Sequence, residues 1–297
     1  MVRTRKWLTL LLVATVAIAA AGCARVSDRS TGNARLVITQ GFGARTLLDR
    51  AAADDGSVLD ALRGLATVDT GFGGGFVNAI DGVASDPGAK RDWFYYVNGV
   101  SPGRGSDQQP LRAGDVSWWD YRPWGGLLDA WAVVGSWPEP FVRGYPTAPT
   151  VVNVDPPLDE PLRRAGAHVG TQASPWRVRV GDDATLRRRD PAWRRAMTDP
   201  VAAGLTVQIR DGRVVVLGAD GTTTRPVPAA RAIAAAVLTG STPEDGGVLL
   251  AVAGLDAPAA MAAADRIARD PGVLGERFAV AFDGAGEPVA IGGRDGL

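Results

Sequence analysis

The first half of the chain, residues 35–124, consists of short apolar runs separated by turn residues. Runs rich in aromatic and β-branched residues predict strands, and these runs are 35–39, 45–49, 76–80, 92–98 and 116–121. Apolar residues recur at helical spacing between positions 58 and 65, which predicts a short helix with Ser57 as its N-cap. Asn98-Gly99, a dipeptide typical of hairpin turns, follows the most aromatic strand. This half therefore predicts a small α+β unit.

The second half, residues 150–297, mixes strand and helix patterns. We expect a hairpin over 205–217, because Asp211-Gly212 separates two apolar runs. Further strands are predicted at 150–154, 176–180, 247–252, 278–282 and 289–291. Helices are predicted at Ala229–Leu238, which is rich in alanine, and at Pro258–Ala268, which has proline near its start. The mixture predicts a second α/β or α+β domain.

Residues 125–149 lie between the two halves and are rich in proline, glycine and tryptophan. Such a composition is typical of a linker between domains. The alternative is that this segment forms part of a face shared by both domains. The pattern alone leaves both interpretations open.

The amino terminus has the layout of an export signal. Three basic residues precede the apolar run Trp7–Ala21, which is too short to cross ~30 Å of hydrocarbon comfortably as a helix. The run ends in Ala20-Ala21-Gly22-Cys23, which resembles the lipobox of bacterial lipoproteins, although Ala20 stands where leucine is usual. The resemblance implies a signal peptide over 1–22 and acyl chains such as palmitate on Cys23. Residues 23–34 then form a polar tether that holds the protein on the extracytoplasmic face of the cell membrane. The alternative is an ordinary secretory signal with an incidental cysteine.

Charge and composition exclude some classes of protein. The chain has 32 basic and 32 acidic residues and is 46% hydrophobic. Residues 1–22 carry three basic and no acidic side chains, so the remainder holds 29 basic and 32 acidic ones. This balance does not predict nucleic acid as a partner. Lys6 and Lys90 are the only lysines, and the abundance of arginine, alanine and glycine is typical of a GC-rich genome such as that of an actinobacterium.

Catalytic and metal-binding patterns are lacking in the sequence. His168 is the only histidine and Cys23 the only cysteine, so no pair has zinc-ligand spacing. Gly71–Gly75 is glycine-rich but lacks the Lys-Ser/Thr of a phosphate-binding loop. We therefore expect neither an enzyme nor a bound metal or cofactor.

Ten aromatic residues fall between positions 93 and 137. Because alternate residues of a strand face opposite sides, Trp93 and Tyr95 share one face of their strand, and Phe94 and Tyr96 share the other. One face can fill the core of the first unit. The other needs a partner, which is either the second domain or a large flat ligand.

Several of these runs resemble the bacterial relatives of the transcobalamin C-terminal domain. The matching motifs are Val58-Leu59 with Ala61-Leu62, Ile80-Asp81-Gly82, Trp93 with Tyr95-Tyr96-Val97-Asn98-Gly99, and Gly114-Asp115 with Tyr121. The resemblance implies a β-grasp-like domain over 35–124 that closes over a face of cobalamin or a similar flat molecule. The residues predicted to bind the ligand are Phe72, Phe76, Tyr95, Tyr96, Trp119, Tyr121 and Trp124.

Together these features predict a surface-anchored lipoprotein that binds a cobalamin-like ligand for a membrane transporter. The alternative is a protein-interaction or structural module of the cell envelope with no small ligand. A roomy cleft between the halves, lined by Trp119, Tyr121 and Trp124, would favour the first hypothesis. A closed and packed interface would favour the second.

Overall fold

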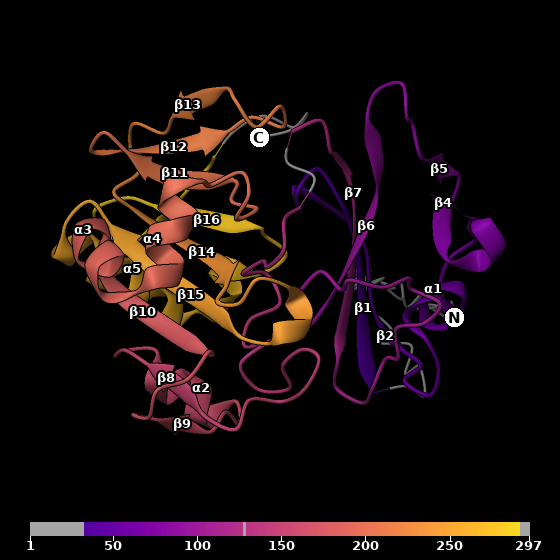
Figure 1. Cartoon of the computed structure of the whole chain (residues 1–297), viewed down its shortest axis with the longest axis horizontal. Coiled ribbons are helices and arrows are strands. Elements are labelled where there is room, and N and C mark those ends of the chain that lie inside the picture. Colours follow the sequence, from indigo (N-terminus) through magenta and orange to yellow (C-terminus); the bar gives the residue numbers. More distant parts are fainter. Residues whose placement is uncertain (1–32, 127–128, 292–297) are drawn as a thin grey trace, which may run out of the picture.

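Residues 129–149 lie between two sheets in the computed structural model, which describes residues 33–126 and 129–291 (Figure 1). The first unit contains β1 to β7 with α1, and the second contains β8 to β17 with α2 to α5. The connecting segment is residues 125–149. Strands outnumber helices, so the fold is α+β or mostly β.

The main sheet of the first unit has the strand order β2-β1-β7-β6. The central pair β1 and β7 is parallel, and both outer pairs are antiparallel. The strand bounds are β1 (Ala34–Gln40), β2 (Arg45–Ala52), β6 (Arg91–Val97) and β7 (Val116–Pro123). Each strand predicted from the sequence for this unit is present.

One face of this sheet is covered by a short helix and a small sheet. Ser57 caps the helix through a capping box with Asp60, which satisfies the amide donors that the first turn leaves unpaired. The elements are α1 (Val58–Arg63), β3 (Val68–Gly71), η1 (Phe72–Gly74), β4 (Phe76–Ile80) and β5 (Val83–Ala84). Val58, Leu59 and Leu62 are buried against the sheet and form its core with Leu36 and Ile38.

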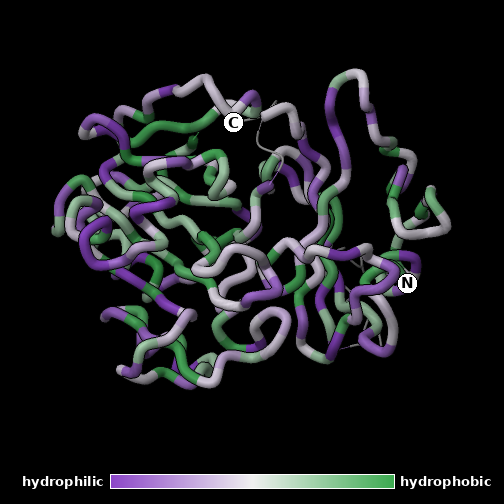
Figure 2. Tube along the Cα trace, in the orientation of Figure 1, coloured by the Kyte–Doolittle hydropathy of each residue, from purple (hydrophilic) through white to green (hydrophobic). Residues whose placement is uncertain are grey.

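The second unit is built on a seven-stranded sheet of order β17-β16-β14-β15-β10-β8-β9. β10 pairs in parallel with β15 and β8, and β14 pairs antiparallel with β15 and β16. The strand bounds are β8 (Val152–Val154), β9 (Val169–Gly170), β10 (Arg177–Asp182), β14 (Ala232–Leu238), β15 (Val248–Gly254), β16 (Ala279–Phe282) and β17 (Pro288–Val289). Figure 2 shows the apolar stretches inside this unit, where β14, β15 and β16 run.

Helices and a small sheet cover both faces of the seven-stranded sheet. α5 packs on one face, while α3, α4 and the sheet β11-β12-β13 pack on the other. The helix bounds are α2 (Asp159–Arg164), α3 (Asp183–Arg189), α4 (Pro191–Thr198), η2 (Pro243–Asp245), α5 (Ala257–Arg269) and η3 (Pro271–Leu274). The small sheet comprises β11 (Val207–Arg210), β12 (Arg213–Leu217) and β13 (Thr224–Pro226), and its first two strands form the predicted hairpin.

One element was predicted wrongly. The alanine-rich stretch Ala229–Leu238, expected to be a helix, contains strand β14 instead. Ala232–Val237 are buried because β14 lies in the middle of the sheet with layers on both faces. Alanine favours helices only as a weak local preference, which burial between two neighbouring strands overrides.

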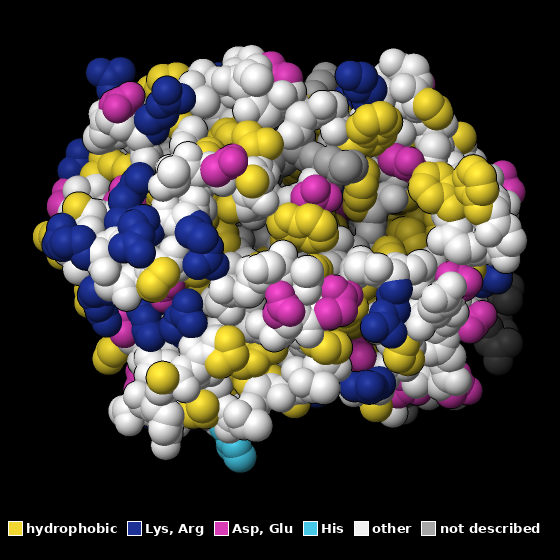
Figure 3. Space-filling view, in the orientation of Figure 1, with side chains coloured by type: hydrophobic (Ala, Val, Ile, Leu, Met, Phe, Trp, Pro, Cys, Tyr) yellow, Lys and Arg dark blue, Asp and Glu magenta, His cyan; other side chains and the backbone are white. Residues whose placement is uncertain are grey.

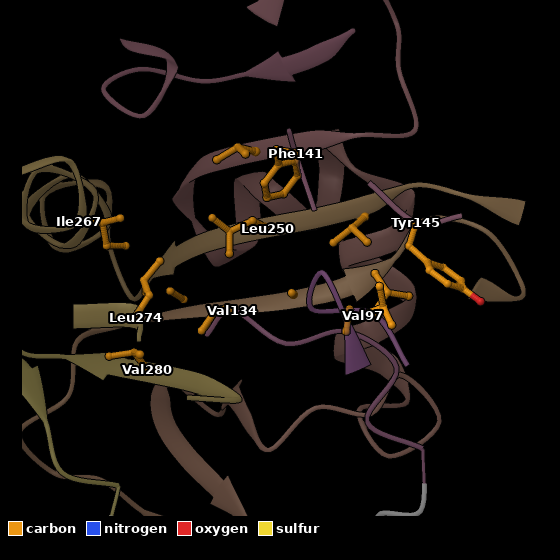
Figure 4. Packing of buried hydrophobic residues seen from close by; sticks show 14 of the residues in the cluster. Val97, Val134, Phe141, Tyr145, Leu250, Ile267, Leu274 and Val280 are labelled. Atoms are coloured by element: carbon orange, nitrogen blue, oxygen red, sulfur yellow. The ribbon is translucent and has the colours of Figure 1, made fainter. Parts of the chain in front are cut away.

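The connecting segment is part of the hydrophobic core. Val134, Phe141 and Tyr145 are buried and belong to one cluster with Leu250 of β15 and Ile267 of α5 (Figure 4). The same cluster includes residues of the first unit such as Val97. The described part of this segment therefore forms a packed layer between the two sheets.

Candidate functional site

The first aromatic face of the main sheet points toward α1 and β5. Tyr95 stacks on Trp119 with ring centres 5.1 Å apart, and Trp93 lies 5.2 Å from Tyr121. Trp119 is only 2% exposed. These rings therefore form core packing of the first unit.

Polar atoms of three side chains on this face donate to backbone groups of the surrounding segments, whereas the buried indole nitrogen of Trp119 has no hydrogen-bond partner. The Trp93 indole nitrogen donates to the Val83 carbonyl oxygen at 2.9 Å, and the Tyr95 hydroxyl donates to the Arg104 carbonyl oxygen at 2.6 Å. The Tyr121 hydroxyl donates to the carbonyl oxygen of Ala84 at 2.9 Å. Burial raises the pKa of Tyr95 well above its usual range, so the hydroxyl remains a donor. These hydrogen bonds attach β5 and the 101–110 loop to the main sheet.

The second aromatic face is covered by the second unit. Tyr96 and Trp118 contact the ring of Phe278, which precedes β16, at 5.4 and 5.2 Å between ring centres. The Arg122 guanidinium lies 3.7 Å from the centre of the Phe94 ring, in the same cluster. Tyr96 is completely buried. The interface between the two units is thus closed and packed at this sheet.

A buried carboxylate strengthens that interface. Asp120 accepts hydrogen bonds from Thr39 and from the backbone amides of Phe42 and Gly43. Burial raises the pKa of the Asp120 carboxyl, and these hydrogen bonds and the nearby Arg122 oppose that rise. Phe42 packs edge-on against Phe278 at 5.2 Å, so the turn that Asp120 organises carries one of the interface rings.

The Val-Asn-Gly and Gly-Asp motifs meet in a buried polar network. The Asn98 side-chain amide donates to Asp115 Oδ1 at 2.8 Å and to the Gly144 carbonyl oxygen at 2.9 Å. Its Oδ1 accepts from the amide of Val116 at 2.9 Å. Asn98 has a φ of +52°, a conformation that asparagine tolerates better than most residues. These motif residues join the β6–β7 turn to the connecting segment.

The seven residues predicted to bind a ligand do not form one surface. Tyr95, Trp119 and Tyr121 share the first face, whereas Tyr96 lies on the opposite one. Two others stand together at the tip between β3 and β4, with Phe72 at 94% and Phe76 at 39% exposure. Trp124 is half-buried at the end of β7, where its amide donates to the carbonyl oxygen of Lys90. The expected cleft lined by Trp119, Tyr121 and Trp124 does not form, because Trp119 faces the core of its own unit.

A cavity lies where the connecting segment meets the second unit. It has a volume of about 550 Å³ and is bounded by Trp131, α4, the turn after α4 and the end of β14. Its apolar wall consists of Trp131, Ala192, Ala196, Ala202, Ala203, Val237 and Leu238. Its polar lining consists of Arg194, Arg195, Thr198, Asp199, Gly240 and Ser241.

The two arginines give this cavity a positive side. The Arg195 guanidinium donates to the Thr239 carbonyl oxygen at 2.9 Å, which orients it. Among the residues that the structure describes, Arg194 has no acidic partner at ion-pair distance. Figure 3 shows that basic side chains gather over the region of α3 and α4. The cavity can therefore accept a partly apolar molecule with an anionic group.

Sequence reasoning did not select the residues of this cavity. Trp131 was noticed only as one member of the aromatic cluster, and Arg194 and Arg195 occur in a helix that had not been predicted. Proline at the first position of α4 and the Asp190 side chain that caps it were local signals of this helix. No local signal of this kind indicates that Trp131, which comes from a segment distant in sequence, lines the same cavity.

Among the described residues, His168 and the acidic side chains form no group that could hold a metal ion. His168 is exposed, and its carbonyl oxygen accepts a hydrogen bond from the amide of Val152. Within residues 33–126 and 129–291, no group of three or more His, Cys, Asp or Glu side chains is placed to hold a metal ion. Cys23 and the predicted signal peptide lie outside the described residues. Of the helices that the structure describes, none has the length and apolar character needed to cross a membrane.

One comparison with known proteins matches part of the first unit. Residues 55–122 match the model of a family described as "Domain of unknown function (DUF4430)". A crystal structure of "a putative metal binding protein from Ruminococcus gnavus ATCC 29149" is similar to part of the chain, with 18% identity and a TM-score of 0.27. That match covers 31% of this chain and 97% of the other. The search of curated proteins finds no match. The resemblance to transcobalamin relatives and the lipid on Cys23 stay predictions.

Proposed function

We propose that this protein binds a small, partly apolar molecule with an anionic group in the cavity beside Trp131, and that its role is binding rather than catalysis. The observation that carries the proposal is the cavity of about 550 Å³ with Arg194 on its wall. Pockets for drug-sized ligands are about 300–1,000 Å³, mostly apolar, with a few polar groups that fix the orientation. This cavity has both the size and the composition.

Because of the position of the cavity, a ligand bound there would contact more than one part of the chain. The Trp131 carbonyl oxygen accepts from the amide of Ser101 at 2.9 Å, which ties the wall to the first unit. A Cβ on Gly204 would lie 2.8 Å from the Trp131 nitrogen, so the turn after α4 touches the same backbone. The connecting segment is thereby fixed from both sides, and a ligand would meet a preformed wall.

Cobalamin is not part of this proposal. Four of the seven aromatic side chains selected for a flat ligand lie on the two faces of the main sheet, and each face is occupied by other parts of the chain. The other three, Phe72, Phe76 and Trp124, lie apart from both faces. For the first unit itself we propose the β-grasp-like description. The order β2-β1-β7-β6, the parallel central pair and α1 packed on one face support it.

We further propose that the protein acts at the extracytoplasmic face of the cell membrane, anchored by acyl chains on Cys23, and passes its ligand to a membrane transporter. Two acyl chains contribute on the order of 20 kcal/mol of membrane affinity, at ~0.8 kcal/mol per buried CH₂. Changing Cys23 to Ser should release the protein from the membrane fraction or block processing. An anchored and normally processed Cys23→Ser variant would contradict the anchor.

The binding site can be tested with 8-anilinonaphthalene-1-sulfonate, an apolar fluorescent probe that carries one sulfonate. We expect saturable binding by the folded protein and at least tenfold weaker binding by Arg194→Glu. Arg188→Glu is the matched control, because Arg188 lies exposed on α3 outside the cavity and its replacement changes the net charge equally. Equal affinity of both variants, with near-ultraviolet circular dichroism unchanged, would exclude this cavity as the site.

A further inference from the structure

Two aromatic side chains project into solvent at the outer end of the first unit. Phe72 is 94% exposed and Phe76 is 39% exposed, and their rings pack edge-on at 6.1 Å. We call this pair the aromatic tip. Figure 3 shows hydrophobic atoms at the surface of this end of the molecule. Exposing a phenylalanine almost fully costs hydrophobic free energy, and a group of exposed apolar side chains commonly marks an interaction site.

The backbone of the tip is held in an unusual conformation that keeps Phe72 outward. Phe72 has a φ of +52°, in the left-handed region that bulky residues rarely adopt. Gly73 and Gly74 follow with φ values of +76° and +107°, and a Cβ on either would meet nothing within 4 Å. Their positive φ angles, rather than close neighbours, therefore define the shape of the turn. Strain of this kind is commonly found at functional sites.

The tip lies at the same end of the first unit as the start of the described chain. A Cβ on Gly105 would lie 3.4 Å from the Gly75 carbonyl oxygen, so the backbone next to the tip contacts the 101–110 loop. The next loop residues bind the amino end of α1, where the Leu59 amide donates to the Ser106 carbonyl oxygen at 3.1 Å. The chain then continues to Gly114, whose amide donates to the carbonyl oxygen of Asn33 at 3.0 Å.

The stretch between Asn33 and Cys23 limits how far this end can be from the anchor. Ten peptide units span at most about 35 Å when fully extended and roughly 18 Å as a flexible coil. The end of the molecule that carries the aromatic tip must then stay close to the bilayer. Thr70–Val77 contains no charged side chain. The Asp107 carboxylate would lie 3.4 Å from a Cβ on Gly75, and the Arg63 guanidinium donates to the Thr70 hydroxyl, so the inserted part is limited to the two phenylalanine rings.

We propose that the aromatic tip inserts into the surface of the bilayer that carries the anchor on Cys23. The inference rests on the proposed anchoring. Transfer of one phenylalanine from water to an apolar medium favours the inserted state by about 10- to 100-fold. This is too weak to recruit a free protein strongly, but the tether keeps the tip at a high effective concentration near the lipid. Insertion fixes the orientation of the first unit relative to the membrane.

The experiment uses the chain 23–297, which retains every described residue, with Cys23 coupled to a maleimide lipid in phosphatidylcholine vesicles. Because Cys23 is the only cysteine, the coupling places the tether at the proposed position whether or not cells acylate it. A 4-fluorophenylalanine is introduced at position 72, and its fluorine signal is recorded with nitroxide-labelled lipid. The control label is at position 141, where Phe141 is 2% exposed inside the core.

We expect the lipid nitroxide to broaden the signal at position 72 at least tenfold more than the signal at position 141. A water-soluble gadolinium chelate should broaden position 72 less in tethered protein than in free protein. Both effects should persist between 0.05 and 0.5 M salt, because the contact is apolar. Equal broadening at the two positions, or full access of gadolinium to position 72 on the vesicle, would overturn the proposal. Release of a Cys23→Ser variant in cells tests the native anchor separately.

Discussion

Replacement of Asn98 tests whether the Val-Asn-Gly motif is structural. Asn98→Ala removes three hydrogen bonds made by a side chain that is 1% exposed. The amide of Val116 and the carbonyl oxygen of Gly144 lose these partners, and an unsatisfied buried group costs about 1–3 kcal/mol. Alanine in the left-handed region adds roughly 1 kcal/mol. We therefore expect a loss of about 3–5 kcal/mol in the free energy of unfolding.

The measurement is urea unfolding at pH 7 followed by tryptophan fluorescence. Asn98→Gly is the control for backbone strain, because glycine adopts a positive φ freely but lacks the amide. It should recover about 1 kcal/mol relative to Asn98→Ala and remain well below the wild type. A loss under about 1 kcal/mol for Asn98→Ala, or wild-type stability of Asn98→Gly, would refute the reasoning, since the hydrogen bonds would then contribute little.

Three further predictions concern the interface and the second unit. Phe278→Ala should lower the free energy of unfolding in urea by about 3–5 kcal/mol, because Phe278 is only 4% exposed. Phe72→Ala should change it by less than about 0.5 kcal/mol, because Phe72 is 94% exposed. Gly135→Ala should lose about 1–3 kcal/mol in the same assay, because its Cβ would lie 2.5 Å from a backbone nitrogen of the loop before β16. Burial raises the pKa of the Asp190 carboxyl, but hydrogen bonds and charge from Arg177 outweigh burial and leave it lowered. The stability from this carboxylate is present above the unfolded pKa of about 3.9 and is lost as pH falls through the folded value. The urea midpoint should therefore decrease less between pH 7 and pH 3 for Asp190→Asn than for the wild type.

The strands of the first unit could be predicted because their side chains carry a strong local signal. Aromatic and β-branched residues favour extended backbone, and Asn98-Gly99 places the turn that ends β6. The alternation of faces was also predictable, since side chains of a strand point to opposite sides. What occupies each face was not predictable. Phe278 covers Tyr96 from almost 200 residues away in sequence, and no local pattern indicates that contact.

The cavity could not be predicted for a related reason. Its walls come from Trp131, from residues 192–203 and from residues 237–241, and they meet only in the tertiary structure. One of these walls belongs to β14, which alanine content had assigned to a helix. A small side chain such as alanine indicates little about its environment. Where the chain is deeply buried, the sequence alone therefore hardly distinguishes a strand from a helix.

The contact of Phe278 with the first unit has a consequence for biosynthesis. Tyr96 and Trp118 are made early, but the ring that covers them follows some 160 residues after Trp118. Until synthesis has passed β16, a nascent chain exposes an aromatic sheet face that the finished protein hides. Chains that stop short of residue 278 should therefore aggregate or engage chaperones, even when the whole of the first unit has been made.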